Sequence, residues 1–291
     1  MDSQLKTPLI VIVGPTASGK TSVAIELAEQ YNGEIICADS RTVYRGLDIG
    51  TAKPSREERS RVPHWGLDLV NPGERFTVAD FKRYSDSKIA DIRRRGKVPF
   101  LVGGSGLYVD AVVFNFRLGG EADEIKREYL DGLDINELHN YCKVHNIELP
   151  ENSANKRYII RAIERSGLII KRELQPADRT FVVGIATNKQ VLRKRIIDRS
   201  EQLFSQSVVN EAKTLGKKYG WDSEAMTGNI YPLIQSYLDK EKTMEEIKEK
   251  FTSVDWALAK RQLTWFRGNP HIIWFSKDEV SIYIREVLAV R

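Results

Sequence analysis

The chain has 291 residues, 41% of them hydrophobic and 29% charged, a composition typical of a globular protein with an apolar core. It contains no run of about 18 apolar residues, so the sequence predicts no membrane-spanning helix. The net charge is +5, from 45 Lys and Arg against 40 Asp and Glu, which suits an anionic partner but equally a solvated basic surface. Cys37 and Cys142 lack metal-ligand spacing and the polar N-terminus lacks a signal-peptide pattern, so we expect a cytoplasmic protein without a disulfide framework.

Strands and helices alternate in the first part of the chain. Three short apolar segments predict buried strands, at Leu9–Val13, Glu34–Ala38 and Val98–Val102. A helical pattern follows the first strand, and Thr77 with Asp80 forms a capping box that opens a helix ending near Arg95. Residues 46–54 are rich in turn formers and predict a loop. This alternation predicts an α/β fold, in which a parallel sheet carries helices on both faces.

The pattern changes after Phe116. Residues 117–172 are rich in charge and carry no strand pattern, so we expect a short helical insertion domain there. The core then consists of residues 1–116 and 173–291. The second part of this core predicts a strand at Phe181–Thr187, one long helix at Lys189–Lys218, a helix opened by Thr243 with Glu246, and a strand at Ile272–Phe275 before a closing helix.

A phosphate-binding loop follows the first predicted strand. Residues Gly14–Thr21 have the sequence GPTASGKT and match G-x-x-x-x-G-K-[ST], between a strand and a helix as this motif requires. Backbone N–H groups and the helix N-terminus would surround phosphate oxygens, Lys20 would add a full charge, and Thr21 would bind Mg²⁺ through its hydroxyl. The diphosphate-binding residues predicted from the motif are Gly14, Thr16, Ala17, Ser18, Gly19, Lys20 and Thr21. The motif does not distinguish ATP or GTP from another diphosphate.

A second feature argues against an ordinary nucleotide hydrolase. Such proteins have an aspartate after a strand that holds Mg²⁺, whereas Val98–Val102 is followed by Gly103-Gly104-Ser105-Gly106. Asp39 instead follows the second predicted strand, at the sheet edge where sites form in such folds. A carboxylate there could reach a bound substrate, cap a helix or support Mg²⁺ through water, and the residues alone leave these roles open.

Five strings resemble those of the tRNA dimethylallyltransferases, the IPP transferase family, in order and over nearly the whole chain. They are Gly14–Thr21, Ala38–Ser40 with Val43–Gly46, Asp48–Pro54, Leu101–Tyr108 and Ala259–Arg267. The resemblance implies a P-loop NTPase-like fold and transfer of a dimethylallyl group from dimethylallyl diphosphate to N6 of the adenosine directly 3′ of the anticodon. The products would be N6-isopentenyladenosine and diphosphate. The implied partner is the tRNA anticodon stem-loop, the implied cofactor is Mg²⁺, and we expect a monomer.

The resemblance also implies roles for individual residues. Asp39 matches the general base that takes a proton from the adenine amine, Ser105 a position beside the reacting base, and Arg199 an arginine on the donor diphosphate. The residues that match tRNA contacts are Asp39, Ser40, Arg41, Thr42, Ser105, Arg127, Arg157, Tyr158, Arg161, Lys260, Arg261, Gln262, Thr264 and Arg267. The chain departs from the family at Ser105 (usually Thr), at Ser153–Asn155, at Ser207 and in Gly228–Pro232, and its insertion is short.

The chemistry of prenyl transfer suits these residues. Charge builds on the departing diphosphate, which N–H groups, Lys20, Arg199 and Mg²⁺ would stabilise. The lone pair of an adenine amine is delocalised into the ring, so a carboxylate such as Asp39 would align the amine and accept its proton.

Two basic helix faces suit RNA. Helical spacing places Arg157, Arg161 and Arg165 on one face, and Trp256, Lys260, Thr264 and Arg267 on another. Basic residues with an aromatic can contact both the RNA backbone and its bases, although either face could equally be solvated. The remaining aromatic pair, Trp265 and Phe266, is expected in the core.

Three other functions stay open at this point. A small-molecule or nucleotide kinase would share the phosphate loop and bind ATP, but it would need an acid after Val102. An adenylate isopentenyltransferase acting on free nucleotides would not need the basic helices. A non-catalytic RNA-binding protein would not need an intact Lys20, Thr21 and Asp39.

Overall fold

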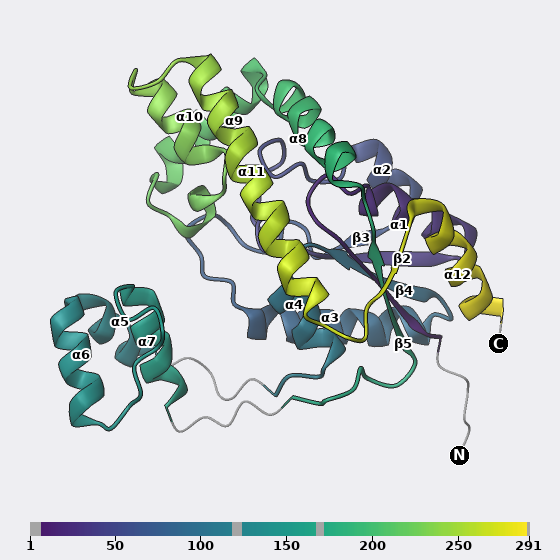
Figure 1. The fold of residues 1–291 in the computed structure, drawn as a ribbon, viewed down its shortest axis with the longest axis horizontal. Helices are drawn as coiled ribbons and strands as arrows, with labels where there is room; N and C mark the ends of the chain where they lie inside the picture. Colours follow the sequence, from purple (N-terminus) through teal and green to yellow (C-terminus); the bar gives the residue numbers. More distant parts are fainter. Residues whose placement is uncertain (1–6, 118–123, 167–171, 290–291) are drawn as a thin grey trace. The chain divides into compact units, whose positions relative to one another are not determined.

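The structure is a computed structural model that describes residues 7–117, 124–166 and 172–289 (Figure 1). The chain divides into two compact units, one of Met1–Asn115 with Glu173–Arg291 and one of Phe116–Arg172. Within the described ranges, no helix is both long enough and apolar enough to cross a membrane.

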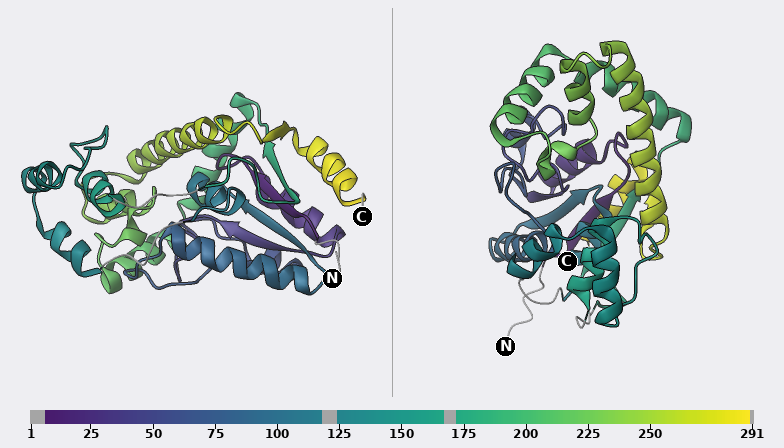
Figure 2. Two further views of the ribbon diagram at one scale, coloured as in Figure 1. Left: turned by 90° about the horizontal axis from the view of Figure 1, so that it is seen from below. Right: turned by 90° about the vertical axis from the view of Figure 1, so that its left-hand side faces the viewer.

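A six-stranded parallel sheet forms the centre of the first unit (Figures 1 and 2). Its strands are β1 Leu9–Val13, β2 Gly33–Ala38, β3 His64–Trp65, β4 Val98–Gly103, β5 Thr180–Ile185 and β6 Ile273–Phe275. They lie in the order β3-β2-β4-β1-β5-β6, and each neighbouring pair is parallel. The predicted strands are confirmed, whereas the two-residue β3 was not anticipated. Because the strands are parallel, the residues after β1, β2 and β4 meet at one edge of the sheet.

Helices cover both faces of the sheet because side chains alternate along each strand. Ile10 and Ile12 of β1 join a buried cluster with α1 (Lys20–Gln30) and α12 (Lys277–Ala289) on one face. Val11 and Val13 join a second cluster on the other face. The α-helices that contribute to this second cluster are α3 Val78–Arg94, α4 Gly106–Val113, α8 Lys189–Leu203, α9 Gln206–Tyr219, α10 Tyr231–Leu238 and α11 Met244–Arg267. Two short helices, α2 Arg56–Arg61 and the 3₁₀ turn Glu224–Thr227, lie in the connections.

The long helix predicted at Lys189–Lys218 is wrong. The segment forms two helices, α8 (Lys189–Leu203) and α9, because the chain leaves helical geometry at Phe204 and Ser205. Phe204 is buried and packs edge-on against Phe251 of α11, with ring centroids 5.5 Å apart. Burying this ring against the core requires a turn that a straight helix could not make, and Ser205 then precedes α9 with an extended backbone.

The two predicted capping boxes are confirmed. Thr77 accepts a hydrogen bond from the backbone N–H of Asp80 at the start of α3, and Thr243 accepts one from Glu246 at the start of α11. In each case the acidic side chain bonds back to the N–H of the capping threonine. These reciprocal bonds satisfy backbone donors that a helix start otherwise leaves open, so the sequence fixes both start points locally.

Three helices make up the described part of the second unit: α5 Glu124–Gly132, α6 Ile135–Val144 and α7 Lys156–Arg165. They enclose a small core of their own, made by Leu130, Leu138, Cys142, Ile159, Ile160 and Ile163. Arg127 of α5 pairs with Asp131 at 3.1 Å and with Glu164 of α7 at 2.7 Å. Asn155, in one of the strings that depart from the family, caps α7 by accepting a hydrogen bond from Arg157 N–H.

The segments that flank the second unit are joined within the first. The side-chain amide of Asn115 donates to Glu173 at 2.7 Å, and Glu173 N–H donates to the carbonyl oxygen of Phe114 at 2.9 Å. Ala177 N–H donates to the carbonyl oxygen of Val113 at 2.8 Å. The sheet-containing unit therefore holds both flanking segments together with its own hydrogen bonds.

Gly103→Ala should destabilise the protein by about 2 kcal/mol, because overpacking a close backbone contact costs roughly this much. A methyl group at Gly103 would lie 2.0 Å from the carbonyl oxygen of Ala38, so β2 and β4 would have to separate. Urea denaturation followed by circular dichroism measures the effect. In the control Gly268→Ala, the new methyl group would meet its nearest atom at 3.4 Å, so its midpoint should equal the wild-type value. A wild-type midpoint for Gly103→Ala would contradict this packing argument.

Candidate active site

The phosphate loop lies between the end of β1 and the start of α1. Gly19 directly precedes α1 with φ of 87°, in the left-handed region that glycine adopts without strain. Ala17 has φ of 60° in the same loop. This backbone path places the loop against the N-terminus of α1, where the partial positive charge of the helix favours an anion.

Lys20 is the first residue of α1, lines the cavity and is half-buried. Its Nζ donates a hydrogen bond to the carbonyl oxygen of Pro15 at 3.2 Å. Burial lowers the pKa of Lys20 to about 8, although the negative charge of Asp39 partly opposes that shift. A diphosphate in contact with the ammonium would raise its pKa again, because an adjacent opposite charge favours the charged form.

Two arginines of α8 hold the phosphate loop. Arg199 donates to the hydroxyl of Thr16, and Arg195 donates to the carbonyl oxygen of Ser18 at 3.1 Å. The Nε of Arg199 is buried and has no hydrogen-bond partner among the described residues. The role of Arg199 was predicted only from the family resemblance. No role was predicted for Arg195.

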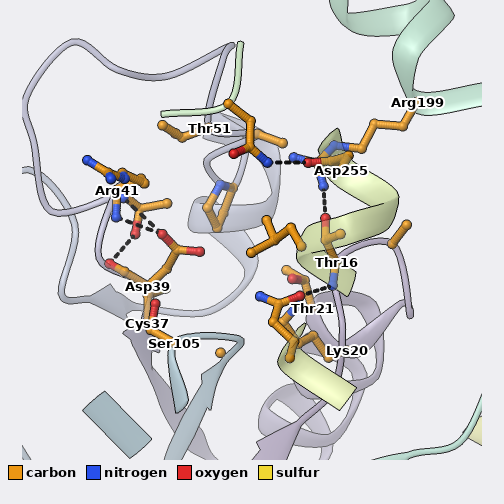
Figure 3. A pocket seen from close by; sticks show the side chains of 18 of the residues that line it. Thr16, Lys20, Thr21, Cys37, Asp39, Arg41, Thr51, Ser105, Arg199 and Asp255 are labelled. Carbon is orange, nitrogen blue, oxygen red and sulfur yellow. Dashed lines mark hydrogen bonds between the residues drawn. The ribbon is translucent and has the colours of Figure 1, made fainter. Parts of the chain in front are cut away.

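Asp39 begins the loop that follows β2. Its Oδ1 accepts hydrogen bonds from the N–H groups of Arg41 at 2.8 Å and Thr42 at 3.3 Å, which closes a turn (Figure 3). No helix starts there, so the helix-cap alternative is wrong. Within the described ranges Oδ2 of Asp39 forms no hydrogen bond, and Asp39 lines the cavity described below. Ser40 N–H donates to the Ser105 hydroxyl at 3.0 Å, which links this loop to the one after β4.

One cavity of about 840 Å³ brings these parts together. Figure 3 shows Asp39 and Arg41 on one side and Thr16, Lys20 and Thr21 on the other. The sequence-predicted residues that line it are Thr16, Ala17, Gly19, Lys20, Thr21, Asp39, Ser40, Arg41, Thr42, Ser105, Arg199, Arg261 and Gln262. The phosphate loop and Asp39 therefore line the same cavity.

The other sequence-predicted residues lie elsewhere. Gly14 and Ser18 belong to the phosphate loop but are not part of the cavity lining. Lys260, Thr264 and Arg267 are exposed on α11. Four more residues belong to the second unit. The side chain of Arg127 is ion-paired with Glu164 and 19% exposed. The other three are exposed residues of α7: Arg157, Tyr158 and Arg161.

Trp265 corrects one expectation. Phe266 is buried as expected, but the side chain of Trp265 is 49% exposed and does not belong to the core. Its Nε1 donates to Asp110 of α4 at 2.8 Å, and its ring lies over Gly106, where even a methyl group would not fit. Neighbouring residues on a helix point in different directions, so one apolar run can have one buried and one exposed member.

Asp255 of α11 was not anticipated. It is 3% exposed, lines the cavity and accepts a hydrogen bond from Asn229 at 3.0 Å through Oδ1. Its Oδ2 is buried without a hydrogen-bond partner in the part of the chain that is described. The sequence could have indicated Asp255 as a site residue in one way only: it is a charged residue four positions after Phe251 on an otherwise apolar helix face.

The loop of residues 46–54, which also lines the cavity, is fixed from two sides. Glu211 of α9 accepts hydrogen bonds from three successive N–H groups at 3.0, 2.8 and 3.0 Å, those of Asp48, Ile49 and Gly50. It also accepts one from the Tyr231 hydroxyl at 2.9 Å. From the other side Lys53 pairs with Asp48 and Asp68, each at 2.7 Å. The segment Gly228–Pro232, where the chain departs from the family, therefore contributes Asn229 and Tyr231 to the support of the site.

The residues present fit Mg²⁺ only in combination with a phosphate ligand. Among the described residues, no group of three or more His, Cys, Asp or Glu side chains could hold a metal ion. Thr21, at the start of α1, lines the cavity and offers a hydroxyl. Mg²⁺ commonly takes one or two protein oxygens together with substrate phosphates and water, and Thr21 suits that arrangement.

Two sequence models and a curated relative all match this chain to isopentenyl-transferring enzymes. The sequence model described as "IPP transferase" matches residues 42–269, and one described as "Isopentenyl transferase" matches residues 7–64. A tRNA dimethylallyltransferase of Halalkalibacterium halodurans is 37% identical over 295 residues, covering 95% of this chain and 93% of that protein.

Solved structures agree with this result. The full-length tRNA isopentenylpyrophosphate transferase from Bacillus halodurans superimposes with a TM-score of 0.75 at 36% identity, covering 98% of this chain and 97% of that one. The tRNA delta(2)-isopentenylpyrophosphate transferase from Staphylococcus epidermidis gives a TM-score of 0.74 at 33% identity, covering 98% and 100%. These proteins have the P-loop NTPase-like architecture that the parallel sheet and phosphate loop display here. With a family match across most of its length and near-complete coverage of such relatives, the chain belongs to the IPP transferase family.

Proposed function

We propose that this protein transfers a dimethylallyl group from dimethylallyl diphosphate to N6 of the adenosine directly 3′ of the anticodon in tRNA. The observation that carries the proposal is the shared cavity, which has a phosphate cradle on one side and the carboxylate of Asp39 on the other. The relatives named tRNA dimethylallyltransferase support the substrate pair.

The phosphate loop, Lys20 and Arg199 would bind the donor diphosphate. As the bond between the prenyl carbon and the diphosphate oxygen breaks, negative charge grows on that oxygen, and prepositioned N–H groups and cations stabilise it. Mg²⁺, held through Thr21 and phosphate oxygens, would add positive charge at the same place. Arg199 lines the cavity, and its planar guanidinium would donate to phosphate oxygens there.

Asp39 would act on the acceptor. The adenine N6 forms its bond to the prenyl carbon, and its proton passes to Oδ2 of Asp39, the oxygen that is free of hydrogen bonds from the described residues. The turn formed by Oδ1 holds the carboxylate still, so it needs no rearrangement to align the amine. Ser105 adjoins this turn by accepting a hydrogen bond from Ser40 N–H, and it would contact the adenine.

An RNA acceptor explains cations that the chemistry does not need. Lys260 and Arg267 are exposed on α11, which also lines the cavity through Gln262 and Arg261. Exposed lysines and arginines next to a site bind phosphates along an RNA strand. The reacting adenosine would be unstacked from its loop to enter the cavity.

Labelled donor identifies the reaction class. The protein is incubated with dimethylallyl diphosphate, ATP, AMP and an anticodon stem-loop RNA, and the label is followed. Label on the stem-loop adenosine supports the proposal. Equal kcat/KM values for AMP and the stem-loop would favour a free-nucleotide enzyme, and ATP turnover without prenyl transfer would favour a kinase.

Asp39→Asn should lower turnover at least about 100-fold, which is the lower range for loss of a general base. Asparagine retains an oxygen for the N–H groups of Arg41 and Thr42, so the turn and the binding of both substrates should persist. Single-turnover assays with separate measurements of donor and RNA affinity test this. Residual turnover above about a tenth of the wild-type rate would show that Asp39 is not the base.

Lys260→Ala combined with Arg267→Ala should make the salt dependence of RNA binding shallower. Two lost phosphate contacts correspond to about 1.4–1.8 units in the slope of log affinity against log salt concentration. The slope is measured by filter binding or fluorescence anisotropy with the stem-loop, and donor affinity should not change.

The matched control removes two other exposed lysines, Lys213 and Lys217 of α9. This variant changes the net charge by the same amount, and its slope should equal that of the wild type. Equal changes in the two variants would mean that RNA responds to net charge and not to α11.

A further inference from the structure

Trp265 of α11 is exposed but firmly held. Its side chain is 49% exposed, and its Nε1 donates a hydrogen bond to Asp110 of α4 at 2.8 Å. A methyl group at Gly106 would lie 2.3 Å from Cδ1 and 2.4 Å from Nε1 of Trp265, so the five-membered ring of the indole packs directly on the backbone of α4. Single exposed apolar side chains are common on protein surfaces. This one differs because a hydrogen bond and a glycine fix the orientation of its ring.

The ring lies next to the half of the cavity that is proposed to receive the adenine. Ser105 lines the cavity and directly precedes the glycine under the indole. On α11 the cavity is lined by Arg261 and Gln262, and Trp265 follows on the same side of the helix, one turn later. Gln262 donates to the carbonyl oxygen of Gly104 at 3.1 Å, so this side of α11 faces the segment after β4. Trp265 itself does not line the cavity, and its ring therefore lies at the rim.

The exposed residues of α11 around Trp265 suit a nucleic acid. Lys260, Arg261 and Arg267 are exposed, and residues 256–267 contain no acidic side chain. Cations of this kind bind phosphates, whereas an aromatic ring stacks on bases, and surfaces that bind single-stranded nucleic acid combine the two. An aromatic ring between basic side chains therefore matches the chemistry of an unpaired RNA segment.

Removal of a base from its stack creates a need for such a ring. The reacting adenosine has to leave the base stack of its loop to enter the cavity. The base next to it then loses a stacking partner and exposes one face to water, which opposes binding. An aromatic side chain at the rim of the cavity can cover that face, because proteins commonly stack unpaired RNA bases on aromatic rings.

We propose that Trp265 stacks on the base directly adjacent to the reacting adenosine and so replaces the partner that this base loses. The inference rests on the proposed function. Asp110 and Gly106 are positioning residues for this contact, because Asp110 orients the indole through Nε1 and Gly106 leaves room for the ring. Every base has a π face, so the contact accepts different bases at this position and adds affinity without selecting a sequence.

The first measurement is the affinity of variants for the anticodon stem-loop RNA. Trp265→Ala should weaken RNA binding about 5- to 150-fold, the range expected for loss of one stack between a base and an aromatic ring. Trp265→Phe keeps an aromatic ring and should lose less affinity. The matched control Ile282→Ala removes another exposed apolar side chain, 56% exposed on α12, and should bind RNA like the wild type. Donor affinity should not change in these variants, because neither side chain lines the cavity.

A fluorescent base distinguishes stacking from a purely structural role of the indole. 2-Aminopurine, whose fluorescence is quenched by stacking, is placed directly 5′ or directly 3′ of the reacting adenosine. With saturating wild-type protein, one of these two positions should stay quenched although its neighbour has left the stack. With saturating Trp265→Ala the same position should brighten several-fold, and with Ile282→Ala it should stay quenched. Trp265→Leu keeps an apolar side chain against α4 but has no ring, so it should behave like Trp265→Ala and replaces it if alanine impairs donor binding.

Two results would overturn the stacking role: an RNA affinity of Trp265→Ala within about twofold of the wild type, or unchanged fluorescence at both positions in that variant. Failure of the proposed function is distinguishable, because the wild type would then neither bind the stem-loop nor prenylate it. A wild type that prenylates the stem-loop, together with either of the two results, would reject the stacking role alone.

Discussion

The parallel register of β1, β4 and β2 is the constraint on which the site depends. Gly103 of β4 is aligned with Val13 of β1 and with Ala38 of β2, so all three strands end at the same level. The phosphate loop, the Asp39 loop and the Gly104–Ser105 segment start from these three ends. A side chain at Gly103 would collide with Ala38, so a glycine is needed to keep the strands in this close pairing. A slip of register would separate the donor cradle from the proposed base.

Helices α8 and α11 supply the remaining side chains of the site at the sheet edge. α8 contributes two arginines to the phosphate loop, and α11 contributes Gln262 and Asp255 to the same cavity. The positive charge of Arg199 repels that of Lys20, and the negative charges of Asp39 and Asp255 oppose this repulsion. A diphosphate bound at the phosphate loop would add further negative charge beside these cations.

Local patterns in the sequence predicted the parts of the fold that local interactions determine. The phosphate loop, the strands and the capping boxes each depend on residues within a few positions of one another, and each appeared where its pattern placed it. The break at Phe204 depends on a contact with Phe251, far along the chain, and periodicity could not show it. Glu211 and Gln262 act on backbone groups more than 150 residues away, at Ile49 and Thr16, where no side-chain pattern marks the partner. Asp39 stood out because it follows a strand, whereas Asp255 lies within an apolar helix face, and no local pattern singled it out.

The hydrogen bonds between residues 113–115 and 173–177 determine how strongly the length of the insertion affects the stability of the sheet-containing unit. Hydrogen bonds within the sheet-containing unit join the two ends of residues 116–172, so this segment is a closed loop on that unit. The entropy of closing a loop grows only with the logarithm of its length, so doubling the length costs about 0.6 kcal/mol. The second unit also has a buried core of its own. Changes in the length of residues 116–172 should therefore cost the catalytic unit little stability.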